Sequence, residues 1–153
     1  MEYCIEFTTV YEDVAAVHDS LYSYNLARTG AERVDVHAER KENQMALVIR
    51  GADGKVYGGI VWHIVYDPAP IHVAADYFFI DDRFRGQGKG AELIGKMEDW
   101  AREHGAEYVS LGTNTFQAPV FYAKMGYTEI GRVPAPTPAL PDNERYSFRK
   151  NIK

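Results

Sequence analysis

The sequence is poor in cysteine: Cys4 is the only one among 153 residues. A single cysteine excludes an internal disulfide, which agrees with a reducing compartment. Because Cys4 lies in an apolar strand pattern and not in an activated setting, we interpret it as a core residue and not as the nucleophile of an acyl-enzyme. The five histidines and this cysteine lack the spacing of a metal site, so we expect no bound metal.

Long hydrophobic runs and basic clusters are also missing. No stretch approaches eighteen consecutive apolar residues, and the N-terminus carries Glu2 and Glu6 in place of a basic leader. We therefore expect no membrane span, no signal peptide and a cytoplasmic location. A net charge of −5 without a Lys/Arg cluster argues against nucleic-acid binding and is compatible with a cationic amine as partner. With 46% apolar residues the chain can bury one core, and we expect a single domain over residues 1–153.

What the sequence does contain is a glycine-rich loop, Arg85-Gly86-Gln87-Gly88-Lys89-Gly90, between an apolar segment and an amphipathic helical pattern. Glycines let the backbone turn tightly and bring N–H groups close to a ligand, and the following helix adds its positive N-terminal end. The loop therefore predicts a phosphate cradle made by backbone amides, with the side chains of Arg85, Gln87 and Lys89 as further candidates. It is not a P-loop, because Gly90 stands where Ser or Thr is needed, and Ala91 breaks the Rossmann pattern.

The hydrophobic pattern predicts an α/β fold with one mixed sheet and helices on both faces. Asp53-Gly54 is a hairpin signal, which favours an antiparallel meander for the strands around it. A capping box from Thr9 to Glu12 is expected to begin the first helix, and a second, less regular helix is expected within residues 22–42. Strands are expected at 3–8, 45–50, 56–66, 71–80, 108–111, 127–133 and 145–152, further helices after Gly90 and from Pro119, and a proline-rich loop at 133–141.

A second signature, Phe121-Tyr122-Ala123-Lys124-Met125-Gly126-Tyr127, follows farther along the chain. Arg-x-x-Gly-x-Gly at 85–90, a helix, a strand and then this short helix resemble the Gcn5-related N-acetyltransferase (GNAT) superfamily, most closely over residues 56–132. The resemblance implies a mostly antiparallel GNAT-like sheet whose fourth and fifth strands splay apart to admit acetyl-CoA. It also implies direct acetyl transfer, in a ternary complex, to a primary amine of a small molecule or peptide.

The same resemblance assigns roles near the cofactor. Tyr122 stands where the family places a tyrosine beside the sulfur, so we expect it to protonate the CoA thiolate; the alternative is a packing residue. A backbone N–H near Phe79 or Ile80, freed by a bulge or splay, is the expected oxyanion donor. Phe121 is assigned to the core or to the cofactor wall, and Asn114 to the cofactor.

The general base is where the chain departs from the family. Ala74 and Ser110 stand at positions where many members carry a carboxylate. Asp76 lies two residues from Ala74 on the same strand face, so we predict that it accepts a proton through water or holds the acceptor's ammonium group; the alternative is a structural aspartate. The missing acids leave a second function open, a non-catalytic acetyl-CoA sensor or scaffold. A nucleotide-binding domain without acyl chemistry is a third.

An aromatic-rich acceptor pocket is expected from the first helical region and the third and fourth strands, where cation–π contacts would favour a cationic amine. Within this group we take Tyr24, Asn25, Arg28 and Trp62, together with Asp76, as acceptor-binding candidates. A homodimer could form through pairing of the last strand, as in some relatives. The remaining residues of the expected pocket are Tyr22, His63, His72 and the proline-rich loop.

Overall fold

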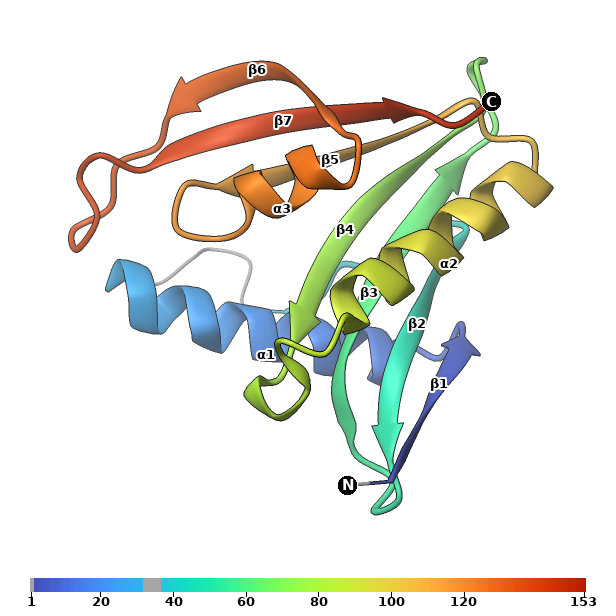
Figure 1. Cartoon of the computed structure of the whole chain (residues 1–153), viewed down its shortest axis with the longest axis horizontal. Helices are drawn as coiled ribbons and strands as arrows, with labels where there is room; N and C mark the ends of the chain where they lie inside the picture. The colour runs from blue at the N-terminus through green and yellow to red at the C-terminus, as the bar shows by residue number, and fades with distance from the viewer. Residues whose placement is uncertain (1, 32–36) are drawn as a thin grey trace.

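The computed structural model describes residues 2–31 and 37–153, which form a seven-stranded sheet in the order β1-β2-β3-β4-β5-β7-β6 (Figure 1). Neighbouring strands are antiparallel except β4 and β5, which run parallel. The elements are β1 (Tyr3–Thr8), α1 (Tyr11–Thr29), β2 (Gln44–Gly51), β3 (Val56–Val65), β4 (His72–Ile80), the 3-10 turn η1 (Asp82–Phe84), α2 (Lys89–Glu103), β5 (Tyr108–Asn114), α3 (Pro119–Lys124), β6 (Thr128–Pro134) and β7 (Glu144–Asn151).

Helix α1 differs from the prediction at both ends. Its N-cap is Val10, without a side-chain cap, so the Thr9–Glu12 capping box is wrong. The helix then continues to Thr29, where Gly30 adopts a left-handed φ of 68° and donates its N–H to the Leu26 carbonyl. Residues 22–29 of the predicted second helix therefore belong to α1, residues 37–42 are not helical, and residues 32–36 lie outside the described part of the chain.

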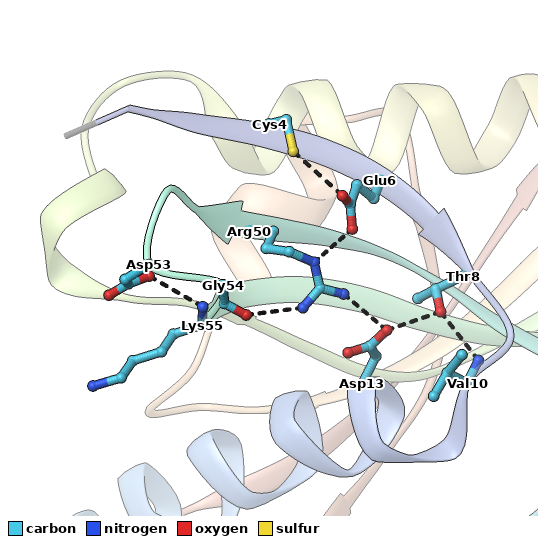
Figure 2. A network of polar contacts seen from close by, with 9 residues as sticks. All are labelled: Cys4, Glu6, Thr8, Val10, Asp13, Arg50, Asp53, Gly54 and Lys55. Carbon is cyan, nitrogen blue, oxygen red and sulfur yellow. Dashed lines mark hydrogen bonds and ion pairs between the residues drawn. The ribbon is translucent and has the colours of Figure 1, made fainter.

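Arg50 joins β1, β2 and the start of α1, and fixes the turn between the first strand and helix (Figure 2). Its Nε donates to Glu6 Oε2 at 2.6 Å, its Nη2 to Asp13 Oδ2 at 2.9 Å, and its Nη1 to the Gly54 carbonyl at 3.0 Å. Thr8 Oγ1 also donates to Asp13, at 2.9 Å. A carboxylate in the first turn complements the positive end of the helix, so Asp13 serves both as an ion-pair partner and as a terminal charge.

Cys4 lies beside this network, with its Sγ 3.5 Å from Glu6 Oε1, and it is exposed. The prediction that Cys4 is a core residue is wrong. Strand β1 forms an edge of the sheet, and this face of it meets a polar network in place of an apolar layer.

Helices cover both faces of the sheet, as predicted. Val61 of β3 packs with Val17 of α1 on one face, whereas its neighbours Ile60 and Trp62 point to the other face, toward Leu93 and the rest of α2. Successive strand residues point to opposite faces, so β3 supplies both cores. Among the described residues, no helix is long and apolar enough to cross a bilayer.

Strands β4 and β5 pair only at their beginnings, and this splay creates the site. The pairs are His72–Tyr108, Val73–Val109 and Ala74–Ser110, while β4 continues to Ile80 and β5 to Asn114. Figure 1 shows the two strands diverging beyond this point. The predicted splay is confirmed.

A bulge in β4 bends the strand within the splayed part. Val61 lies opposite Tyr77 but the next β3 residue, Trp62, lies opposite Ala75, so Asp76 is the additional residue on β4. The bulge therefore lies at Asp76 and not at Phe79 or Ile80, which are both in register with β3.

Candidate active site

A cavity of about 530 Å³ occupies the opening between the splayed strands. It brings together segments that are far apart in the sequence, from α1 at one end to β7 at the other. The lining residues are His18, Leu21, Tyr22, Tyr24 and Asn25 of α1, residues 75–80 of β4, Arg85 and Gly90 of the glycine loop, Leu111, Gly112 and Thr113 of β5, Gln117, Ala118, Phe121 and Tyr122 around α3, and Arg145 of β7.

Two backbone amides of β4 face this opening. The N–H of Asp81, directly after β4, donates to the Tyr57 carbonyl, so Asp81 bonds to β3. Because N–H groups alternate sides along a strand, Phe79 also faces β3, while Phe78 and Ile80 face the edge that β5 has left. The predicted donor at Ile80 is therefore directed toward the cavity and the one at Phe79 is not. Phe78 was missed, although strand alternation could have indicated it.

The glycine loop presents unpaired amides at the start of α2. Gly86 and Gly88 have φ values of 73° and 75°, and apart from their chain neighbours no atom of the described residues lies within 4 Å of where a Cβ would stand on either. Gly88 is the N-cap, and its carbonyl accepts from the N–H of Glu92. The N–H groups of the first helical turn before Glu92 have no intrahelical acceptor, so they can bind an anion.

The side chains of this loop mainly brace it. Arg85 Nε donates to the Ile80 carbonyl at 2.8 Å, and Gln87 Nε2 donates to the Arg83 carbonyl at 2.8 Å. Lys89 Nζ lies 4.7 Å from the centre of the Tyr3 ring. These contacts leave the backbone amides as the favoured phosphate ligands, with Arg85 also lining the cavity.

Phe121 of α3 packs against the glycine loop. A Cβ on Gly90 would come within 3.3 Å of its ring, so glycine permits the close approach of α2. The rings of Phe121 and Phe78 meet edge-on with 6.1 Å between centroids. Phe121 thus packs against the core and also lines the cavity, and its role in the cofactor wall stays a prediction.

Tyr122 is held inside the cavity by aromatic packing. Its side chain is 7% exposed, and its ring lies within 6.3 Å of those of Phe78, Phe121 and Phe148. The hydroxyl makes no hydrogen bond to the described residues and is not among their enclosed unbonded polar atoms, so it opens into the cavity. Burial raises the pKa of Tyr122 well above its usual range, and the nearby Arg145 charge offsets only part of this increase. The phenol is therefore a protonated donor at neutral pH.

The comparisons with known proteins agree with this geometry. Residues 11–127 match the family model described as Acetyltransferase (GNAT) family. The chain belongs to the GNAT acetyltransferase family.

It is 31% identical over 116 residues to acetyltransferase Atu2258 of Agrobacterium fabrum, covering 76% of each protein. It is 35% identical over 112 residues to blasticidin-S acetyltransferase of Streptomyces morookaense, covering 71% of this chain and 77% of that one. The crystal structure of an acetyltransferase from Bacillus cereus is 26% identical, with a TM-score of 0.61 and 88% of each chain covered. The prediction of an acetyl-CoA-dependent N-acetyltransferase is confirmed at the level of the family.

The helix that carries Tyr122 in this GNAT protein is anchored at its C-terminal end. Lys150 Nζ donates to the Met125 carbonyl and to Glu98 Oε1, both at 2.9 Å, and the Tyr127 hydroxyl donates to Glu98 Oε2 at 2.8 Å. Burial, with the adjacent Glu98 carboxylate, raises the pKa of Tyr127 far above its usual value. The cluster joins α2, α3 and β7. Glu98 and Lys150 were missed because only the fold brings them together.

Asp76 is enclosed by its own partners. Its carboxylate is 3% exposed and accepts from Lys41 Nζ at 2.8 Å, His63 Nδ1 at 2.9 Å and Gln44 Nε2 at 3.3 Å. Desolvation lowers the pKa of Lys41, but hydrogen bonding to Asp76 and the charge of that carboxylate raise it more, so that the net change is upward. These contacts favour a structural role for Asp76. Its role as the general base stays a prediction.

A chain of amide side chains closes one end of the GNAT cavity. Asn143 donates to Asn114 Oδ1 at 3.1 Å, Asn114 donates to Gln117 Oε1 at 3.0 Å, and Gln117 donates to Asn25 Oδ1 at 3.0 Å. Asn25 and Gln117 line the cavity, whereas Asn114 is buried behind them. The structure therefore places the predicted cofactor ligand Asn114 in a supporting position.

Two of the predicted acceptor residues lie elsewhere. Trp62 is fully buried and packs against Trp100 of α2, with 5.6 Å between ring centroids, on the face away from α1. Arg28 does not line the cavity but lies over the Tyr24 ring at 4.9 Å, and Tyr24 itself is part of the wall. The sequence analysis did not select His18 or Tyr77 as site residues. His18 lies on α1 and Tyr77 on β4, two of the elements that form the cavity wall.

Proposed function

We propose that this protein transfers the acetyl group of acetyl-CoA directly to a primary amine of a small molecule, with both substrates bound in the cavity. One observation carries the proposal: the Tyr122 hydroxyl and the inward amides of β4 face the same opening, which ends at the glycine loop. A volume of about 530 Å³ suits the acetyl end of acetyl-CoA together with a small amine. A relative named for acetylation of blasticidin-S supports an acceptor of this kind.

The loop supplies the binding site for the CoA pyrophosphate. Left-handed Gly86 and Gly88 expose the backbone, and the unpaired first-turn amides of α2 add the positive end of a helix. Arg85 gives an additional positive charge at the cavity wall. The amides of Phe78 and Ile80 would then hold the extended part of acetyl-CoA, which supplies an activated acetyl group.

Acetyl transfer requires a donor for the thiolate, and Tyr122 meets this requirement. A buried phenol stays protonated at neutral pH, and its hydroxyl opens toward the space that the splayed strands enclose. The thiol of CoA is a stronger acid than the phenol, so transfer of the phenol proton to sulfur is uphill on its own. A hydrogen bond from the hydroxyl stabilises the negative charge that develops on sulfur, and reprotonation of the phenolate completes the transfer.

A non-catalytic acetyl-CoA sensor is the second candidate. Ala74 and Ser110, which lack carboxylates, and the enclosed carboxylate of Asp76 favour it, because the family's usual acids are not available as bases. The two functions differ in whether amines cause release of the CoA thiol.

Calorimetric titration with acetyl-CoA and CoA, followed by thiol release against a panel of primary amines, tests the proposal. We expect acetyl-CoA binding and amine-dependent release. Tyr122→Phe should lower kcat by about 10²-fold while leaving acetyl-CoA binding intact. The matched control is Tyr66→Phe, whose hydroxyl is lost from an exposed residue. Binding without release from any amine would favour the sensor, and no binding would reject both.

A further inference from the structure

His18 is a buried imidazole on the wall of the cavity. It lies on α1, is 5% exposed and lines the opening opposite α3. Its ring meets the Tyr77 ring edge-on at 4.9 Å and stacks with the Tyr22 ring at 6.1 Å. Aromatic neighbours from α1 and β4 therefore fix the plane of the imidazole.

Asp19 determines which nitrogen of His18 can accept a proton. Its Oδ1 lies 2.9 Å from His18 Nδ1, and an ionised carboxylate can only accept, so Nδ1 carries the hydrogen. The lone pair of a neutral imidazole then resides on Nε2. Nε2 has no hydrogen bond with the described residues, among which only Trp62 Nε1 and Asn143 Oδ1 are enclosed without a partner. His18 Nε2 is therefore open to the cavity.

The other ionisable groups of the described wall are less suited to accept a proton. Arg85 and Arg145 stay protonated, and a phenol such as that of Tyr122 is a donor near neutral pH. Asp76 already accepts from three side chains. Histidine is the side chain whose charge ordinarily changes near neutral pH, which suits a general base.

We propose that His18 is the general base of the transfer, an inference that rests on the proposed function. Nε2 takes a proton from the acceptor's nitrogen as that nitrogen bonds to the acetyl carbon. The carbon–sulfur bond breaks, Tyr122 donates its proton to the departing sulfur, and the proton that His18 took from the amine returns to the Tyr122 phenolate through solvent. Proton acceptor and proton donor stand on α1 and α3, on opposite sides of the cavity.

The experiment uses 2-phenylethylamine as the probe, because an aromatic wall suits an aryl-alkyl amine. We expect His18→Gln to lower kcat for this amine by about 10²-fold while the Kd for acetyl-CoA stays unchanged. The matched control is His104→Gln, at an exposed histidine beyond the end of α2. Added imidazole should restore part of the activity of His18→Ala, a response that a merely structural histidine would not give.

Each outcome decides the inference. Near-normal turnover of His18→Gln overturns the role of His18 and leaves the proposed function standing. Lost turnover without imidazole rescue, together with a lower Tm or weaker acetyl-CoA binding in both variants, also overturns it and makes His18 a packing residue. No thiol release by the unaltered protein with 2-phenylethylamine or any amine of the panel overturns the proposed function and the inference together.

Discussion

Gln117 Nε2 donates a 3.0 Å hydrogen bond to Asn25 Oδ1, joining residues 92 positions apart in the chain. The bond links α1, which covers the half of the sheet that ends at β4, to the loop before α3, which lies on the other half. Gln117 Oε1 in turn accepts from the backbone N–H and the side-chain amide of Asn114. The Gln117 side chain thus connects segments on the two sides of the splay.

Gln117→Leu should destabilise the protein by roughly 1–3 kcal/mol, because it leaves polar groups of Asn25 and Asn114 unsatisfied in buried positions. Urea denaturation measures the change. Gln87→Leu is the control, since the bond it removes is exposed, and it should cost much less. Equal losses in the two variants would contradict the bridging role of Gln117.

Gly88→Ala should weaken acetyl-CoA binding by about tenfold, because a left-handed φ of 75° costs a non-glycine residue about 1–2 kcal/mol and the free loop avoids this cost by leaving the binding conformation. There is open space around the site, so the effect comes from the backbone and not from a clash. Calorimetry on Gly95→Ala gives the control. Gly95 is inside α2 with nothing nearby, and this variant should bind normally and be more stable by about 0.5–1 kcal/mol.

Asp76→Asn should reduce the free energy of unfolding by about 1–3 kcal/mol and leave kcat little changed. The variant loses a buried ion pair, but Lys41 is one third exposed and can regain water, which moderates the cost. Asp99→Asn, an exposed aspartate paired with Arg102, should have almost no effect on stability. A collapse of kcat at unchanged stability would instead restore Asp76 as the base.

Alkaline pH should destabilise the protein through Tyr127. Its pKa is raised in the folded state, so above about pH 10 the unfolded chain loses this proton while the folded chain keeps it. The free energy of unfolding then falls with pH, by about 1.4 kcal/mol per unit for one such tyrosine. Urea titrations from pH 8 to 11 should show a shallower fall for Tyr127→Phe, and an unchanged slope for Tyr66→Phe, at an exposed tyrosine.

Most strands and helices could be predicted from the sequence, because apolar periodicity and turn-forming residues are visible within short segments. Asp53-Gly54, for example, lies in the turn between β2 and β3, where Gly54 has a left-handed φ of 82°. The length of α1 was not predicted because its second half faces a cavity. The buried residues of that half are polar, namely Asn25 and Thr29, and give no apolar stripe.

The same distinction, between short motifs and long-range packing, applies to the residues of the candidate site. The glycine loop and Tyr122 could be predicted because each lies in a short contiguous motif. Trp62 was misplaced because alternation shows which strand residues share a face, but not which face bears the cavity. His18 and the bond between Gln117 and Asn25 depend on how α1 packs across the sheet, which is a property of long-range contacts.

Three residue pairs join β4 to β5, and the two halves of the sheet diverge beyond them (Figure 1). The glycine loop and the β4 amides lie on one arm, and Tyr122 lies with α3 on the other. The spacing between the groups that grip the donor and the group that protonates it is thus set by the angle between two half-sheets. Val73 and Val109 pair across this junction, are fully buried and do not line the cavity. Substitutions there can therefore change the angle between the half-sheets, and with it the rate of transfer, without changing any residue of the cavity.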